Sequence, residues 1–212
     1  MFAKDYRKQA WNRLSGNWGA TILAFLLYTL IIGALSFTGI GTIILTGPLY
    51  VGMVAVFVQL ARTGTTKIEH MFEGITTGFV NKMLAFILVS LYAVLWTMLF
   101  WIPGFVKSFS YAMTYYILND NPEMSANDAI TRSREMMDGH KWQLFCLRLS
   151  FIGWYLLSAL TFGVLLIVVM PYMQAAEAEF YEKLKNDELA AKGITAEATF
   201  VEEPVADTTD FN

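Results

Sequence analysis

Long apolar segments alternate with shorter stretches that carry most of the charge. The apolar segments cover residues 18–37, 41–61, 83–102, 105–119, 142–160 and 164–181. A helix that crosses a bilayer needs roughly 20 mostly apolar residues. The segment 105–119 is shorter than that, which leaves open whether it is tilted little, packed inside the bundle or re-entrant. The pattern predicts an all-α membrane protein with six transmembrane or membrane-embedded helices.

The connections between these segments differ in charge. Residues 38–40, 103–104 and 161–163 form short turns without charged side chains, whereas 13 of the 15 Lys and Arg residues lie in the N-terminal stretch, the two long connections and the C-terminal stretch. Short basic loops stay on the cytoplasmic side of a membrane. We therefore expect three hairpins in the cell membrane, with the tight turns outside and both termini in the cytoplasm.

Composition and charge agree with a membrane domain followed by a tail. Hydrophobic residues make up 56% of the chain and charged residues 16%, against about 25% charged in an ordinary soluble domain. Residues 186–212 are acidic and lack a hydrophobic period, so we expect a disordered cytoplasmic tail after a membrane domain at residues 1–185. The single Cys146 excludes a disulfide within the chain. The first apolar run is long enough to span a membrane, so we expect no cleavable signal peptide.

Evenly spaced glycines indicate an internal repeat. Gly16, Gly78 and Gly139 are separated by 62 and 61 residues, and each precedes an apolar segment. Prolines follow them in the second half of each hairpin, at Pro48, Pro103 and Pro171. Fixed spacing of this kind predicts three repeat units, at about residues 1–62, 63–119 and 120–185. The alternative is that any hairpin protein places glycines at helix ends and prolines near turns.

Each hairpin is preceded by an amphipathic stretch, at residues 2–14, 66–79 and 125–138. Thr66 and Ser125 can cap the second and third, since each has an acidic residue three positions later. The predicted inner faces are Phe2, Tyr6, Ala10 and Leu14; Ile68, Met71, Phe72, Ile75 and Phe79; and Ala129, Ile130, Ser133, Met136 and Met137. Such helices either lie at the cytoplasmic membrane interface or cap the bundle and touch little lipid.

Several local motifs resemble one known family. They are Leu-Ser-Gly-Asn-Trp-Gly at residues 14–19, Gly-Pro-Leu at 47–49 with Gly52, Ile-Pro-Gly at 102–104 with Lys107 and Tyr111, Met-Met-Asp-Gly-His-Lys-Trp at 136–142, Leu-Ser-Phe-Ile-Gly-Trp at 149–154, Pro-Tyr at 171–172 and Phe-Tyr at 180–181. Together they resemble the domain-of-unknown-function 975 family of bacterial integral membrane proteins, over almost all of residues 1–185. The activity of that family is uncharacterised, so the resemblance implies no catalytic residues. A weaker, fold-level likeness is to the membrane domain attached to some glycerophosphodiester phosphodiesterases.

Two sets of polar residues are candidates for a site. Arg132, Arg134, His140 and Lys141 form a basic cluster that can contact anionic lipid headgroups, although we favour ordinary positive-inside anchoring as its explanation. Arg148 and Glu177 lie at similar depths in consecutive apolar segments, so we expect an intramembrane ion pair, with Glu179 as the competing partner.

The sequence carries no signature of catalysis. His70 and His140 have no neighbours with metal-ligand spacing, and no phosphate-binding loop or nucleophile motif occurs. We therefore expect a non-enzymatic membrane protein without a cofactor or nucleic-acid partner, which interacts with lipids, with membrane or envelope proteins or with its own copies. The alternative is a transporter or channel for a small molecule or a lipid, which a polar cavity among the helices would favour.

Overall fold

The chain folds into helices connected by short turns and loops. The computed structural model describes residues 3–37, 39–99 and 101–191, and the secondary structure within these ranges is entirely helical. The helices are α1 (Ala3–Leu14), α2 (Trp18–Ser36), α3 (Ile40–Thr63), α4 (His70–Thr76), α5 (Phe79–Leu99), α6 (Trp101–Ser110), α7 (Thr114–Asp120), α8 (Ala126–Met136), α9 (Lys141–Leu149), α10 (Ile152–Leu160) and α11 (Leu166–Ala191). The all-α prediction is confirmed.

Four stretches are long and apolar enough to span a membrane, rather than the six expected. They are Trp18–Ser36, Gly41–Thr63, Phe79–Met98 and Lys141–Leu160. The segment 105–119 is divided between α6 and α7, which are too short to span separately. Helix α11 is long, but its sequence becomes polar from Gln174 onward. The arrangement as six spans in three hairpins stays a prediction.

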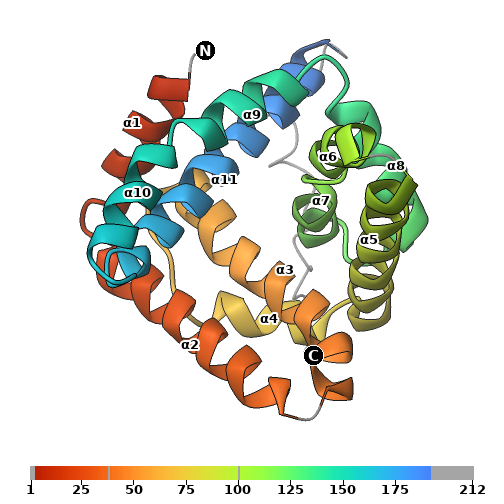
Figure 1. Ribbon diagram of the computed structural model, residues 1–212, viewed down its shortest axis with the longest axis horizontal. Coiled ribbons are helices and arrows are strands. Elements are labelled where there is room, and N and C mark those ends of the chain that lie inside the picture. The colour runs from red at the N-terminus through yellow and green to blue at the C-terminus, as the bar shows by residue number, and fades with distance from the viewer. Residues whose placement is uncertain (1–2, 38, 100, 192–212) are drawn as a thin grey trace, which may run out of the picture.

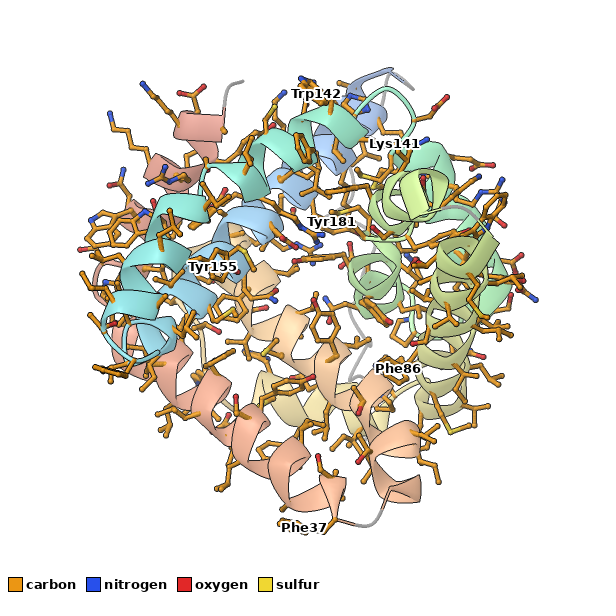
Figure 2. All side chains as sticks on the ribbon, in the orientation of Figure 1. Phe37, Phe86, Lys141, Trp142, Tyr155 and Tyr181 are labelled. Atoms are coloured by element: carbon orange, nitrogen blue, oxygen red, sulfur yellow. The ribbon has the colours of Figure 1, made fainter. Side chains whose placement is uncertain are left out.

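Helix α3 occupies the centre of the bundle. It contacts α2, α4, α5, α7 and α11, and it crosses the middle of the view in Figure 1. Of its most apolar window, 61% is buried, against 11% for the windows on α2 and α5. The outer helices therefore present apolar side chains such as Leu30 and Met98 to the surroundings. Figure 2 shows Phe37 and Trp142 at the periphery. Apolar faces that point outward are what lipid-embedded helices require.

Two of the three amphipathic stretches bury the faces that the sequence predicts. In α1, the buried residues are Tyr6, Ala10 and Leu14, and the helix packs against α11 and α9; Phe2 lies outside the described residues. In α8, Ala129, Ile130 and Ser133 are buried, and the helix packs against α5 and α7. The hydroxyl of Ser125 accepts the Asp128 backbone N–H at 3.2 Å, as the capping signal predicts.

The second amphipathic stretch forms only part of the predicted helix. Helix α4 begins only at His70, because Thr66 donates its hydroxyl to the Val56 carbonyl at 2.9 Å instead of capping a helix. The chain thus runs back along α3, where Gly74 and Gly52 allow the two backbones to touch. Phe72, which was expected on the inner face, is 44% exposed. Met71 of the expected face is fully buried, and the two helices also meet through close backbone contact.

The three repeat glycines share one backbone conformation. Gly16, Gly78 and Gly139 all have positive φ, and each lies between an amphipathic helix and the apolar helix that follows. Their common geometry is in keeping with a repeat, which stays a prediction.

Residues 186–191, which were expected to belong to the acidic tail, instead continue α11. The remainder of that tail lies outside the described residues.

Candidate functional site: the charged face of α11

Helix α11 carries a series of carboxylates that meet basic residues from four other helices. The ion pairs join it to α9, α1, α3 and α8: Arg148–Glu177, Arg13–Glu179, Arg62–Glu182 and Arg132–Glu188. Because the basic partners come from residues far apart in the sequence, α11 holds the N-terminal, central and C-terminal parts of the bundle together. Removing water from an unpaired charge is costly, so a charged side chain that becomes buried is stabilised by a partner of opposite charge.

The structure brings Arg148 and Glu177 together. The guanidinium donates to both carboxylate oxygens, with Nε–Oε1 at 2.8 Å and Nη2–Oε2 at 3.1 Å. The side chain of Glu177 is 3% exposed and that of Arg148 is 38% exposed. The competing carboxylate, Glu179, instead pairs with Arg13 at 3.4 Å. The Arg148–Glu177 pair thus fixes α9 against α11 with a two-point contact of the kind that arginine forms best.

Asp120 at the end of α7 is the centre of a second network of ion pairs and hydrogen bonds. It accepts hydrogen bonds from Arg62 Nη2 at 2.7 and 2.8 Å, from Lys185 Nζ at 2.6 Å and from the Tyr181 hydroxyl at 2.9 Å. Burial alone would raise the pKa of Asp120, but the positive charges of Arg62 and Lys185 outweigh it and hold the pKa below its ordinary value. Asp120 therefore stays ionised and ties α3 and α11 to α7.

Sequence reasoning missed this network. Asp120 lies 58 residues from Arg62 and 65 from Lys185, so no local spacing links them. The only available signal was that each stands at or near the end of an apolar segment, where charged residues are ordinary.

A polar cavity lies beside this network, between α3, α4, α7 and α11. It has a volume of about 320 Å³. The polar residues that line it are Gln59, Arg62, His70, Glu73, Asn119, Asp120 and Lys185. His70 Nδ1 and Glu73 Oε1 are 2.9 Å apart. Charged groups of both signs, contributed by four helices, thus line the cavity.

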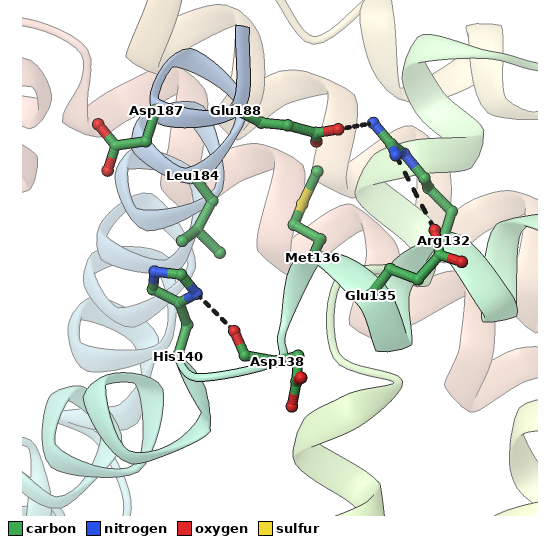
Figure 3. A pocket seen from close by; sticks show the side chains of 8 residues that line it. All are labelled: Arg132, Glu135, Met136, Asp138, His140, Leu184, Asp187 and Glu188. Carbon is green, nitrogen blue, oxygen red and sulfur yellow. Dashed lines mark hydrogen bonds and ion pairs between the residues drawn. The ribbon is translucent and has the colours of Figure 1, made fainter. Parts of the chain in front are cut away.

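Two of the four predicted headgroup residues line a different cavity, of about 350 Å³, between α8, the turn after it and α11. Figure 3 shows Arg132 and His140 lining it together with the carboxylates Glu135, Asp138, Asp187 and Glu188. Arg134 and Lys141 are not among its lining residues. Carboxylates therefore outnumber bases in this cavity.

Three of the four predicted headgroup residues also contact acidic or carbonyl groups. Arg132 bonds Glu188 and lies 4.0 Å from Glu135. Lys141 pairs with Asp138 at 3.8 Å, and His140 Nδ1 is 2.9 Å from the Asp138 carbonyl oxygen. Headgroup binding by Arg132, Arg134, His140 and Lys141 stays a prediction, and the local charge does not favour it.

A family model matches part of the chain. Curated proteins and solved structures show no significant similarity to the chain. The matching family model is described as Protein of unknown function (DUF975), and it covers the end of α5 through most of α11. The motifs at residues 14–19 and 47–52 lie outside this match, so the resemblance is confirmed over a shorter range than the sequence predicted. Over residues 98–188, the chain matches the family of unknown function DUF975 that its own motifs predict.

Proposed function

We propose that the protein is a multi-pass protein of the cell membrane, with cytoplasmic termini, that acts without catalysis by interacting with membrane lipids or with membrane and envelope partners. The exposed apolar faces of α2 and α5 support embedding in lipid. The distribution of Lys and Arg supports the orientation. Lipid interaction is the form of the proposal that the contacts favour.

The observation that carries the proposal is the amphipathic helix α1. Its buried face attaches it to α11 and α9, while Lys4, Lys8 and Trp11 are exposed on its other side. Exposed lysines beside an indole ring are suited to the headgroup region, because the charges attract lipid phosphates and the ring settles at the interface. Unlike Arg132 and Lys141, Lys4 and Lys8 have no ion pair in the described part of the chain.

Lipid preference in reconstituted vesicles tests this proposal. The full chain is placed in vesicles that contain phosphatidylglycerol and phosphatidylcholine, and tryptophan quenching by brominated lipids gives the relative affinity for the anionic lipid. We expect a preference for phosphatidylglycerol that falls about fivefold for each of Lys4→Gln and Lys8→Gln, since a lysine near the surface contributes about 1 kcal/mol.

The matched control is Lys67→Gln, which removes an exposed lysine from the loop before α4. It should leave the preference unchanged. Equal affinity for the two lipids in the unaltered protein would contradict the proposal, as would an equal effect of all three substitutions.

Transport of a small molecule or a lipid is the second candidate function. It is favoured by the polar cavity beside α3 and by the interruptions between α6 and α7 and between α9 and α10. Discontinuous helices that border polar cavities are common in transporters. Solute or lipid flux across vesicles that contain the protein, abolished by filling the cavity with Gln59→Trp, would establish this function over the first.

A further inference from the structure

The cavity beside α3 has the size and construction of a small-molecule site. Its volume of about 320 Å³ falls within the range of roughly 300–1,000 Å³ that small ligands occupy in proteins. Its walls come from four helices, α3, α4, α7 and α11. A ligand there would touch parts of the chain that are far apart in sequence, so its binding would affect the whole bundle.

The charges that line this cavity cancel. Arg62 and Lys185 are positive, and Glu73 and Asp120 are negative. An ion of a single sign would lose its hydration without meeting a net opposite charge, which is unfavourable. A molecule that carries one charge of each sign can instead place each charge beside its complement.

Some polar groups of the cavity wall are held by one another, and others are available to hydrogen-bond a ligand. Arg62, Lys185 and the Tyr181 hydroxyl all hold Asp120, which is 8% exposed. In contrast, the side-chain amides of Gln59 and Asn119 make no hydrogen bond within the described ranges, and each offers a carbonyl acceptor and an N–H₂ donor. A rigid charged wall with unused donors and acceptors lowers the cost of ordering a site when a ligand enters.

We propose that this cavity binds a small zwitterion of the free amino acid class, with the ligand carboxylate toward Arg62 and Lys185 and the ligand ammonium toward Glu73. This site is separate from the lysines of α1 to which the lipid preference is assigned. Failure of one proposal therefore leaves the other standing.

Thermal unfolding of the full chain in detergent micelles tests the site with named probes. L-Glutamine and L-alanine represent zwitterions, succinate a dianion, putrescine a dication and glycerol a neutral polyol. We expect at least one of the two amino acids to raise Tm saturably, while succinate, putrescine and glycerol leave it unchanged. Gln59→Leu and Asn119→Leu should each weaken the apparent Kd about fivefold, the usual effect of one lost hydrogen bond.

Gln143→Leu is the matched control, because Gln143 is exposed on α9 away from the cavity. It should leave the apparent Kd unchanged, and the Tm of each variant without ligand identifies a substitution that merely impairs folding. The proposal is overturned if neither amino acid raises Tm. It is also overturned if one of the other three probes raises Tm equally, or if the apparent Kd is the same in Gln59→Leu, Asn119→Leu and the unaltered protein.

Discussion

At the scale of single residues, the buried carboxylate of Glu177 is paired with a basic side chain. Glu177 is almost fully buried and meets Arg148 through two hydrogen bonds. Such a pair adds little net stability over apolar residues of the same shape, but loss of one partner leaves a buried charge without compensation. The depth of both residues in consecutive apolar segments made this pairing predictable from the sequence.

A double-mutant cycle measures the Arg148–Glu177 pair. Arg148→Leu should lower the free energy of unfolding by about 3 kcal/mol, the lower end of the range for a buried pair, because over a third of the Arg148 side chain remains exposed. The double variant with Glu177→Leu should lose less than either single variant. Denaturant unfolding in micelles gives the values, and strictly additive losses would refute the pairing. Lys183→Ala with Asp187→Ala, a pair on α11 whose acidic partner is exposed, serves as the control and should couple weakly.

Asp120 makes part of the stability depend on pH. Its pKa is lowered in the folded protein, so its contribution is complete above the ordinary carboxyl pKa of about 4 and is lost as the pH falls through the folded value. Asp120→Asn should lower the unfolding free energy at neutral pH by about 2 kcal/mol. It should also flatten the decline in stability below about pH 4. Unfolding curves at several pH values check this. An unchanged acid decline in the variant would show that other carboxylates are responsible.

At the scale of elements, the amphipathic helices were predictable from the sequence, but the close packing of one helix backbone on another was not. Amphipathic periodicity located α1 and α8 with their buried faces. It was only partly right for α4, because the contact between Gly52 and Gly74 depends on the absence of side chains, which a hydrophobic pattern does not register. The hydrogen bond from Thr66 to Val56 also joins residues of two different predicted elements, so the expected cap was not available.

The crossing of α3 and α4 depends on Gly52. A Cβ there would overlap the carbonyl oxygen of Met71, which belongs to the backbone and cannot rotate away. Gly52→Ala should therefore lower the unfolding free energy by about 2–3 kcal/mol. Gly33→Ala on α2 is the control, since nothing lies near its added Cβ; it should stabilise the protein by up to about 1 kcal/mol through helix propensity. Equal effects of the two substitutions would contradict the close crossing.

The three repeat glycines should respond in a graded way to substitution. All have positive φ, at 97°, 56° and 75° for Gly16, Gly78 and Gly139, so alanine should cost about 1 kcal/mol or more at each. Gly78→Ala should cost most, because its Cβ would also overlap the Pro122 carbonyl, whereas the other two meet open space. Thermal unfolding of the three variants checks the order. A neutral effect at any of the three would remove that position from the repeat.

At the scale of the whole molecule, composition and periodicity predicted the helical class and the apolar outer surface, but not the tertiary arrangement. Apolar segments look alike in sequence whether they are central, as α3 is, or peripheral, as α2 and α5 are. The predicted sixth segment belongs to α11, whose polar half is needed for the ion pairs with Arg13, Arg62 and Arg148. The cavities and the Asp120 network could not be predicted, because they form only where helices distant in sequence meet.

The orientation in the membrane is the central claim, and cysteine labelling in intact cells tests it most directly. In a Cys146→Ala background, single cysteines are placed at the exposed turn residues Phe37 and Phe162, and at the exposed residues Lys8 and Glu123 in the charged stretches. A thiol reagent that does not cross the membrane should label Phe37→Cys and Phe162→Cys from outside. It should reach Lys8→Cys and Glu123→Cys only after the membrane is opened. Labelling of Glu123→Cys in intact cells, with Phe162→Cys protected, would contradict the account.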